Sequence, residues 1–116
     1  MILYTLIANA DAFMVALAII RGVTMTMPKP SVVITNRPYP ETIAHLEPHC
    51  RVVANTGVDP WPHDELTDHL RSATAMMAFM PDSVDGPLLD QCPDLKFISC
   101  ALKGYDNFDL DACSSR

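Results

Sequence analysis

Short apolar segments alternate with amphipathic helical segments from residue 31 onward, and this alternation restricts the fold more than any other feature. The expected strands, rich in aliphatic or β-branched residues, are 31–35, 51–54, 75–80 and 96–100. The expected helices are 41–46, 63–72, 87–91 and a last one that Asp109 or Asp111 can cap. Strands that alternate with helices through short connections predict an α/β fold, with a parallel sheet and flanking helices.

Side-chain patterns inside these segments indicate which residues form the core. The apolar run at 75–80 suits a strand that is covered on both faces, as strands of parallel sheets are. Met76 and Met77 in this run are therefore expected to be buried. Leu66 and Leu70 are four residues apart and should share the inner face of their helix.

Residues 1–27 differ in character from the rest of the chain, because residues 1–20 are strongly apolar. A secretory signal would begin with basic residues, and here Arg21 follows the apolar stretch. A membrane span would carry Asp11 near its middle, at a cost of about 2.5–3.5 kcal/mol. We therefore expect residues 1–27 to be an extension outside the domain, which occupies 28–116. A membrane anchor and a helix packed on the domain stay open as alternatives.

Charge and cysteine content argue against several classes of protein. The formal net charge is −6 and the 8 Lys and Arg residues are scattered, which disfavours a nucleic-acid partner. No CxxC pair and no zinc-finger spacing of His and Cys occurs, so no metal site is expected. Free thiols, buried or half-buried in a protein of the reducing cytoplasm, are the simplest interpretation of the cysteines. These are Cys50, Cys92, Cys100 and Cys113.

The sequence contains no recognisable nucleotide-binding turn. A dinucleotide site needs closely spaced glycines between a strand and a helix, so that backbone amides can approach the pyrophosphate. The glycines lie far apart, at Gly22, Gly57, Gly86 and Gly104. The GxSxG and HExxH motifs of hydrolases and metalloproteases are absent as well. We therefore expect no cofactor-binding residue in this chain.

Two loops are candidates for ligand binding, because parallel α/β sheets bind ligands beyond the carboxyl ends of their strands. The first loop is 80–82 and the second is 101–107. The second loop contains Lys103, whose ammonium group beside backbone amides would attract a small anion. The alternative for Lys103 is a solvated loop lysine, and for Met80 it is a core side chain.

The second loop also carries a motif. GYDNFD at 104–109 resembles the loop and helix start of D-isomer-specific 2-hydroxyacid dehydrogenases. A lysine directly before the glycine, in ALKG at 101–104, resembles the phosphonate (phosphite) dehydrogenases of that family. The sequence AMMAFMPD at 75–82 agrees with this subgroup. The resemblance covers residues 29–116.

The resemblance implies an incomplete flavodoxin-like substrate (catalytic) domain and assigns roles to the second loop. In the family, the lysine at the Lys103 position contacts the anionic substrate, and the methionine at the Met80 position lines the pocket. The backbone at Leu102 and Gly104 also approaches the substrate. The residues implied to support the loop are Asp106 and Asn107. The family's catalytic arginine, glutamate and histidine and its NAD-binding Rossmann domain lie further along the chain than Arg116, so no catalytic residue is expected here.

Three hypotheses of function follow. The leading one is the amino-terminal part of an NAD-dependent oxidoreductase that oxidises phosphite to phosphate, with a D-2-hydroxy acid as the alternative substrate. The resemblance implies a cytoplasmic homodimer for the full-length form, and this chain alone is expected to be inactive. The second hypothesis is a non-catalytic, stand-alone module that binds an anion or a partner chain. The third is a membrane-anchored domain that uses residues 1–20.

Overall fold

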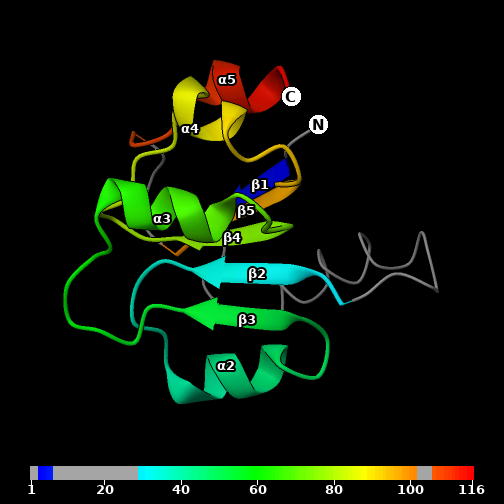
Figure 1. Ribbon diagram of the computed structural model, residues 1–116, viewed down its shortest axis with the longest axis vertical. Coiled ribbons are helices and arrows are strands. Elements are labelled where there is room, and N and C mark those ends of the chain that lie inside the picture. The colour runs from blue at the N-terminus through cyan, green and yellow to red at the C-terminus, as the bar shows by residue number, and fades with distance from the viewer. Residues whose placement is uncertain (1–2, 7–28, 102–105) are drawn as a thin grey trace.

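A computed structural model describes residues 3–6, 29–101 and 106–116 of the chain. A five-stranded sheet with the strand order β1-β5-β4-β2-β3 forms its centre, and every pair of neighbouring strands is parallel (Figure 1). The strands are β1 (Leu3–Leu6), β2 (Ser31–Ile34), β3 (Arg51–Ala54), β4 (Ala75–Ala78) and β5 (Phe97–Cys100). The helices are α2 (Pro40–Leu46), α3 (His63–Leu70), α4 (Gly86–Asp90) and α5 (Leu110–Ser114). The expected α/β architecture with a parallel sheet and flanking helices is confirmed.

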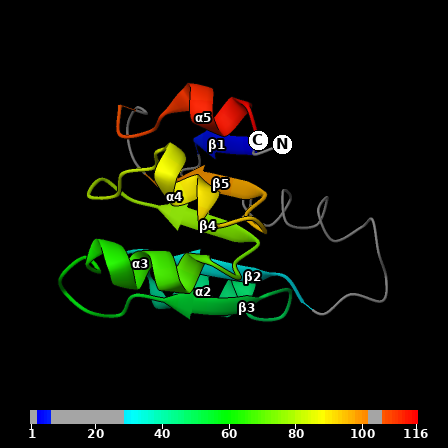
Figure 2. The ribbon, with the colours of Figure 1, turned by 45° about the horizontal axis from the view of Figure 1, so that its top comes forward.

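Two apolar layers lie on opposite faces of the sheet, because successive side chains of a strand point to opposite sides. On one face, Val33 of β2, Met76 of β4 and Ile98 of β5 pack with the inner residues of α3, α4 and α5. Figure 2 shows α3 and α4 in front of the sheet. The other face buries a second cluster, which includes residues of β2, β4 and β5 together with Leu46 of α2.

The central strands are buried on both faces, as the sequence predicted for the apolar run. Met76 and Met77 have exposed fractions of 0% and 6%, so both belong to the core as expected. Leu66 and Leu70 also point inward from α3, at 5% and 0%. The strand β4 is shorter than predicted, however, because it ends at Ala78 and the chain turns before Met80.

One strand was not expected from the sequence. β1 pairs with β5 in parallel, from Leu3 opposite Phe97 to Leu6 opposite Cys100. Leu3–Leu6 therefore belongs to the sheet and not to a segment outside the domain. The physical reason is that the outer edge of β5 presents unpaired backbone groups, which any extended segment can satisfy whatever its sequence pattern. Residues 7–28 lie outside the described part of the chain.

Within the described ranges, no helix has the length and apolar character that crossing a membrane requires.

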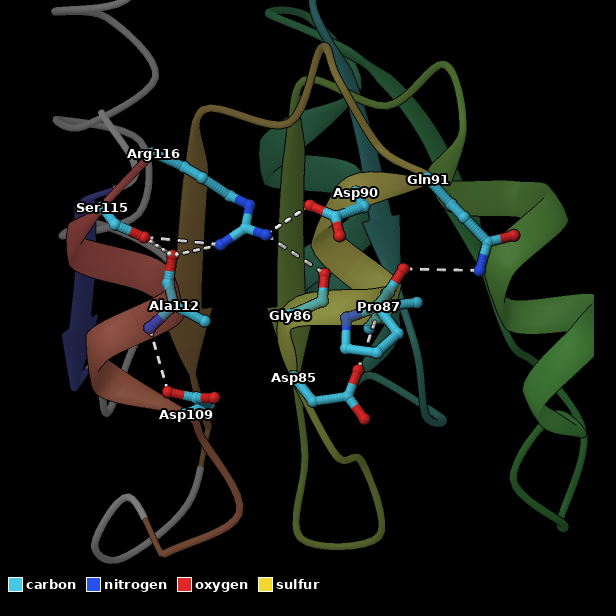
Figure 3. A network of polar contacts seen from close by, with 10 residues as sticks. Asp85, Gly86, Pro87, Asp90, Gln91, Asp109, Ala112, Ser115 and Arg116 are labelled. Carbon is cyan, nitrogen blue, oxygen red and sulfur yellow. Dashed lines mark hydrogen bonds and ion pairs between the residues drawn. The ribbon is translucent and has the colours of Figure 1, made fainter.

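A network of polar contacts joins α4 to α5 at the surface (Figure 3). Arg116 donates hydrogen bonds to Ala112 O at 2.9 Å and to Gly86 O at 3.4 Å, and it forms an ion pair with Asp90. Each helix begins with an aspartate cap, since Asp85 accepts from Leu88 N–H and Asp109 accepts from Ala112 N–H, both at 2.9 Å. Such contacts fix the orientation of α5 and of the loop that leads into it.

The structure therefore selects Asp109, and not Asp111, as the cap of the last helix. Asp109→Ala should lower the free energy of unfolding by about 1 kcal/mol, because the Ala112 N–H loses its acceptor. Asp111→Ala is the matched control, because Asp111 is exposed in the first turn of α5, two residues after the cap, and its loss should cost about 0.5 kcal/mol or less. Urea denaturation of the two variants measures both values. Equal losses would contradict the assignment of the cap.

Candidate functional site

Buried polar residues gather at the edge of the sheet where the strands end. Every pair of neighbouring strands is parallel, so the carboxyl ends of the strands share one edge, towards which the arrows of β2 and β3 point in Figure 1. Thr35 directly follows β2, Asn55 directly follows β3, and Asp82 lies in the turn after β4. Their exposed fractions are 2%, 4% and 8%. Ligands bind at this edge in parallel α/β sheets, which makes the three residues candidates for organising a site.

Asp82 is held by two donors from different parts of the chain. Its Oδ2 atom accepts a hydrogen bond from Phe79 N–H at 2.6 Å and a short one from the Thr35 hydroxyl. Asp82 N–H in turn donates to Phe79 O at 3.0 Å, which closes the turn after β4. The Thr35 hydroxyl also lies 3.3 Å from Met77 O, so two acceptors compete for its single hydrogen.

The environment of Asp82 shifts its acid–base behaviour. Burial raises the pKa of this carboxyl group above its ordinary value of 3.8, because the charged form loses its hydration. The hydrogen bonds from Phe79 N–H and Thr35 act in the opposite direction and lower the pKa by favouring the charged form. Desolvation is the larger effect, so the ionised carboxylate is costly to keep at this position.

Asn55 extends the polar network towards the outer strand. Its Nδ2 atom donates to Thr35 O at 3.3 Å and to Asp59 O at 2.9 Å. Its Oδ1 atom accepts from Gly57 N–H at 2.9 Å. Every polar atom of this side chain is thus used, and the side chain shapes the loop after β3.

Asn107 connects the two loops that follow β4 and β5. Its Nδ2 atom donates to Asp82 O at 2.5 Å. Val84 N–H donates to Asn107 O at 3.0 Å, and Asp109 N–H donates to Val84 O at 2.8 Å, which makes an isolated parallel bridge between Val84 and Phe108. Asn107 therefore lies where support of the loop requires it, and that role stays a prediction.

The other residues proposed from the sequence are distributed unevenly. Met80 is 69% exposed at the tip of the turn after β4, so the alternative of a core methionine does not hold. Asp106 is exposed. The segment Leu102–Gly104, which includes Lys103, lies outside the described residues. Sequence reasoning placed Asp82 in the first candidate loop but did not predict its contacts, and it missed Thr35 and Asn55, although a polar residue directly after a buried strand was a usable signal.

The cysteine nearest this edge is not a reactive group. Cys100 ends β5 and is 1% exposed. Burial, and to a lesser extent the neighbouring Cys113, raises the pKa of its thiol to about 11. The thiol therefore stays protonated at neutral pH, and a thiolate nucleophile is not available there.

The described residues do not fit a dinucleotide. A pyrophosphate needs a helix amino terminus with free N–H groups and a close backbone approach. The loop after β4 leads into α4, but the carboxylate of Asp85 already accepts Leu88 N–H at that terminus. Its negative charge opposes a phosphate. α2 and α3 begin after Tyr39 and Pro62, without a glycine-rich turn. This part of the chain therefore forms no NAD site.

Comparison with known proteins gives a consistent family. The sequence profile described as "D-isomer specific 2-hydroxyacid dehydrogenase, catalytic domain" matches residues 32–116. The chain is 30% identical over 90 residues to a glyoxylate reductase of Aeropyrum pernix, which covers 78% of this chain and 27% of that protein. It is 36% identical over 87 residues to a glyoxylate/hydroxypyruvate reductase B of Serratia proteamaculans, which covers 75% and 26%. The chain thus spans about a quarter of the length of these relatives.

A solved structure shows the same fold. The NAD+-bound 3-phosphoglycerate dehydrogenase of Entamoeba histolytica superposes with a TM-score of 0.60 at 21% identity. The match covers 76% of this chain and 30% of that one. The relatives are named as reductases of glyoxylate or hydroxypyruvate, and the phosphite specificity expected in the sequence analysis is not shown.

The raised pKa of Asp82 predicts a pH dependence of stability. Between the ordinary value of 3.8 and the higher folded value, the unfolded chain releases a proton that the folded chain retains. The stability of the wild type relative to Asp82→Asn should therefore be greatest below 3.8 and should fall as pH rises through this window. Chemical denaturation at several pH values, with the exposed Asp94→Asn as the control, measures it. A difference that grows with pH would contradict the assignment.

Proposed function

The chain belongs to the D-isomer specific 2-hydroxyacid dehydrogenase family, and on this basis we propose that it supplies the substrate-binding edge of an NAD-type oxidoreductase for a small 2-hydroxy or 2-oxo acid. The observation that carries the proposal is the network of Thr35, Asp82 and Asn107 at the carboxyl ends of the strands. It holds two loops in place at the edge where α/β sheets bind ligands. The exposed side chain of Met80 lies on one of these loops.

The two loops have different roles in this proposal. The backbone amides of Leu102–Gly104 bind the carboxylate of the substrate, and Met80 forms an apolar wall beside its carbon chain. A bound nicotinamide cofactor would supply the hydride chemistry, and this chain contributes orientation of the substrate. The family resemblance extends the proposal to a homodimer in the cytoplasm.

Phosphite is the second candidate substrate, and Lys103 is the observation that favours it. A carboxylate is bound well by backbone amides alone, whereas phosphite carries more negative charge near neutral pH. A lysine directly before Gly104 adds a positive charge at the same loop. The two candidates therefore differ in how much they depend on one ammonium group.

A chimera tests both candidates. Residues 29–116 replace the matching segment of the Aeropyrum pernix glyoxylate reductase, and the absorbance of the reduced cofactor is followed with NADH and glyoxylate, or with NAD and phosphite. We expect turnover of glyoxylate. A folded chimera that binds the cofactor but leaves glyoxylate unchanged would overturn the main proposal.

Lys103→Ala separates the two substrates in the same chimera. If phosphite is a substrate, the variant should lower kcat/KM for phosphite by more than about tenfold, because a charge-assisted contact is lost. Glyoxylate turnover should fall much less. Lys96→Ala is the matched control, since Lys96 is exposed before β5 and away from the carboxyl ends of the strands. Equal phosphite kinetics in the two variants would remove the phosphite candidate.

A further inference from the structure

We propose that Asp82 is a positioning residue that locks the turn after β4 to residues 106–109 after β5, so that these two segments keep one position relative to each other. The inference rests on the proposed function for its consequence, the alignment of the two loops around a substrate. The contacts of Asp82 with Thr35 and Asn107, called the lock below, are a property of the described residues and can be tested without a substrate.

Asp82 is held through both its side chain and its main chain. Its carboxylate accepts from the Thr35 hydroxyl, which fastens the turn to the end of β2. Its main-chain carbonyl accepts from Asn107 Nδ2 at 2.5 Å, which fastens the turn to the loop after β5. One residue thus joins three segments that are far apart in the sequence, since its partners are 47 and 25 positions away.

A purely local role for Asp82 does not account for these contacts. An aspartate that only stabilises its own turn needs the contact with Phe79 N–H and no more. The hydroxyl of Thr35 comes from the end of β2 and the amide of Asn107 from the loop after β5, and the two side chains are buried and half-buried. The two distant partners therefore indicate that the turn is held in a particular place relative to the rest of the edge.

Burial of the Asp82 carboxyl group lowers the stability of the fold, so stability does not explain why the group is buried. The side chain is 8% exposed, and no lysine, arginine or histidine among the described residues forms an ion pair with it. A buried carboxyl group without a cation costs free energy that a neutral side chain would avoid. Burial also raises the pKa of this group, which reflects the same penalty on the charged form. We explain the buried carboxyl group of Asp82 by its effect on the position of the turn after β4.

The lock extends along the main chain beyond Asp82. Val84 N–H donates to Asn107 O and Asp109 N–H donates to Val84 O, so two further bonds join the same loops. Met80 lies between Phe79 and Asp82, both held by the lock, and its exposed side chain is therefore aimed from a fixed turn. A shift of this turn relative to the loop after β5 would change the width of the candidate site.

Amide hydrogen exchange in the full 116-residue chain tests the lock. Thr35→Val removes the hydroxyl and keeps the branched shape. Thr67→Val is the matched control, because Thr67 is also buried and donates its hydroxyl to His63 O, but from α3. We expect the Val84 and Asp109 amides to exchange at least about tenfold faster in Thr35→Val than in Thr67→Val, since local opening controls their exchange. Equal rates in the two variants would overturn the proposal.

A second variant removes the contact between Asn107 and Asp82. Asn107→Ala removes the donor to Asp82 O and should accelerate exchange of Phe79 N–H, which Asn107 does not touch. Asp82→Asn keeps the shape of the side chain and serves if Thr35→Val does not fold. Acceleration confined to the loop after β5 in Asn107→Ala would mean that the loops open independently, and the proposal would be rejected.

Titration of the same variants with glycolate, by calorimetry, tests the consequence. If the wild-type chain binds glycolate, Thr35→Val should weaken binding by at least about fivefold, a loss of pre-organisation, while Thr67→Val should not. Equal affinity of the two variants would overturn the positioning role. If the wild-type chain binds neither glycolate nor inorganic phosphite, the proposed function loses its support, and the exchange rates alone decide the lock.

Discussion

Burial of β2, β4 and β5 on both faces is the constraint on which the rest of the structure depends. These strands consist of buried residues throughout, so their side chains form two apolar layers and none of their faces is open to a ligand. Polar side chains can then serve a site at the ends of the strands. Thr35 and Asp82 follow β2 and β4, Asn55 follows the neighbouring strand β3, and all three side chains are buried.

The polar network at this edge costs some stability and fixes the relative positions of two loops. Asp82 is buried and has no ion pair with a cation among the described residues, and burial raises its pKa. Its carboxylate and its main-chain carbonyl connect the end of β2, the turn after β4 and the loop after β5. Sites with pre-organised loops bind small ligands better than mobile ones, because less ordering is required when the ligand arrives. The family membership and the network therefore support the same interpretation of this edge as a substrate-binding surface.

The sequence predicted the architecture well and the network poorly. Apolar periodicity located the helices and four of the five strands, because buried strands and amphipathic helices leave local patterns. β1 was missed, since a strand at the edge of a sheet is defined by its partner β5 and not by a pattern of its own. The contacts of Asp82 were missed for a related reason: they join residues 47 and 25 positions apart, which no local pattern encodes. The roles of Lys103 and Met80 were implied by the family resemblance, and both roles stay predictions.

The most direct test of the account is to map where glycolate binds, by following amide chemical shifts of the full chain during a titration. We expect the shifts to concentrate in residues 79–84 and 101–109, at the carboxyl ends of β4 and β5, with little change at the opposite edge of the sheet. Saturable shifts that cluster instead around the amino ends of the strands, near Thr74 and Lys96, would contradict it.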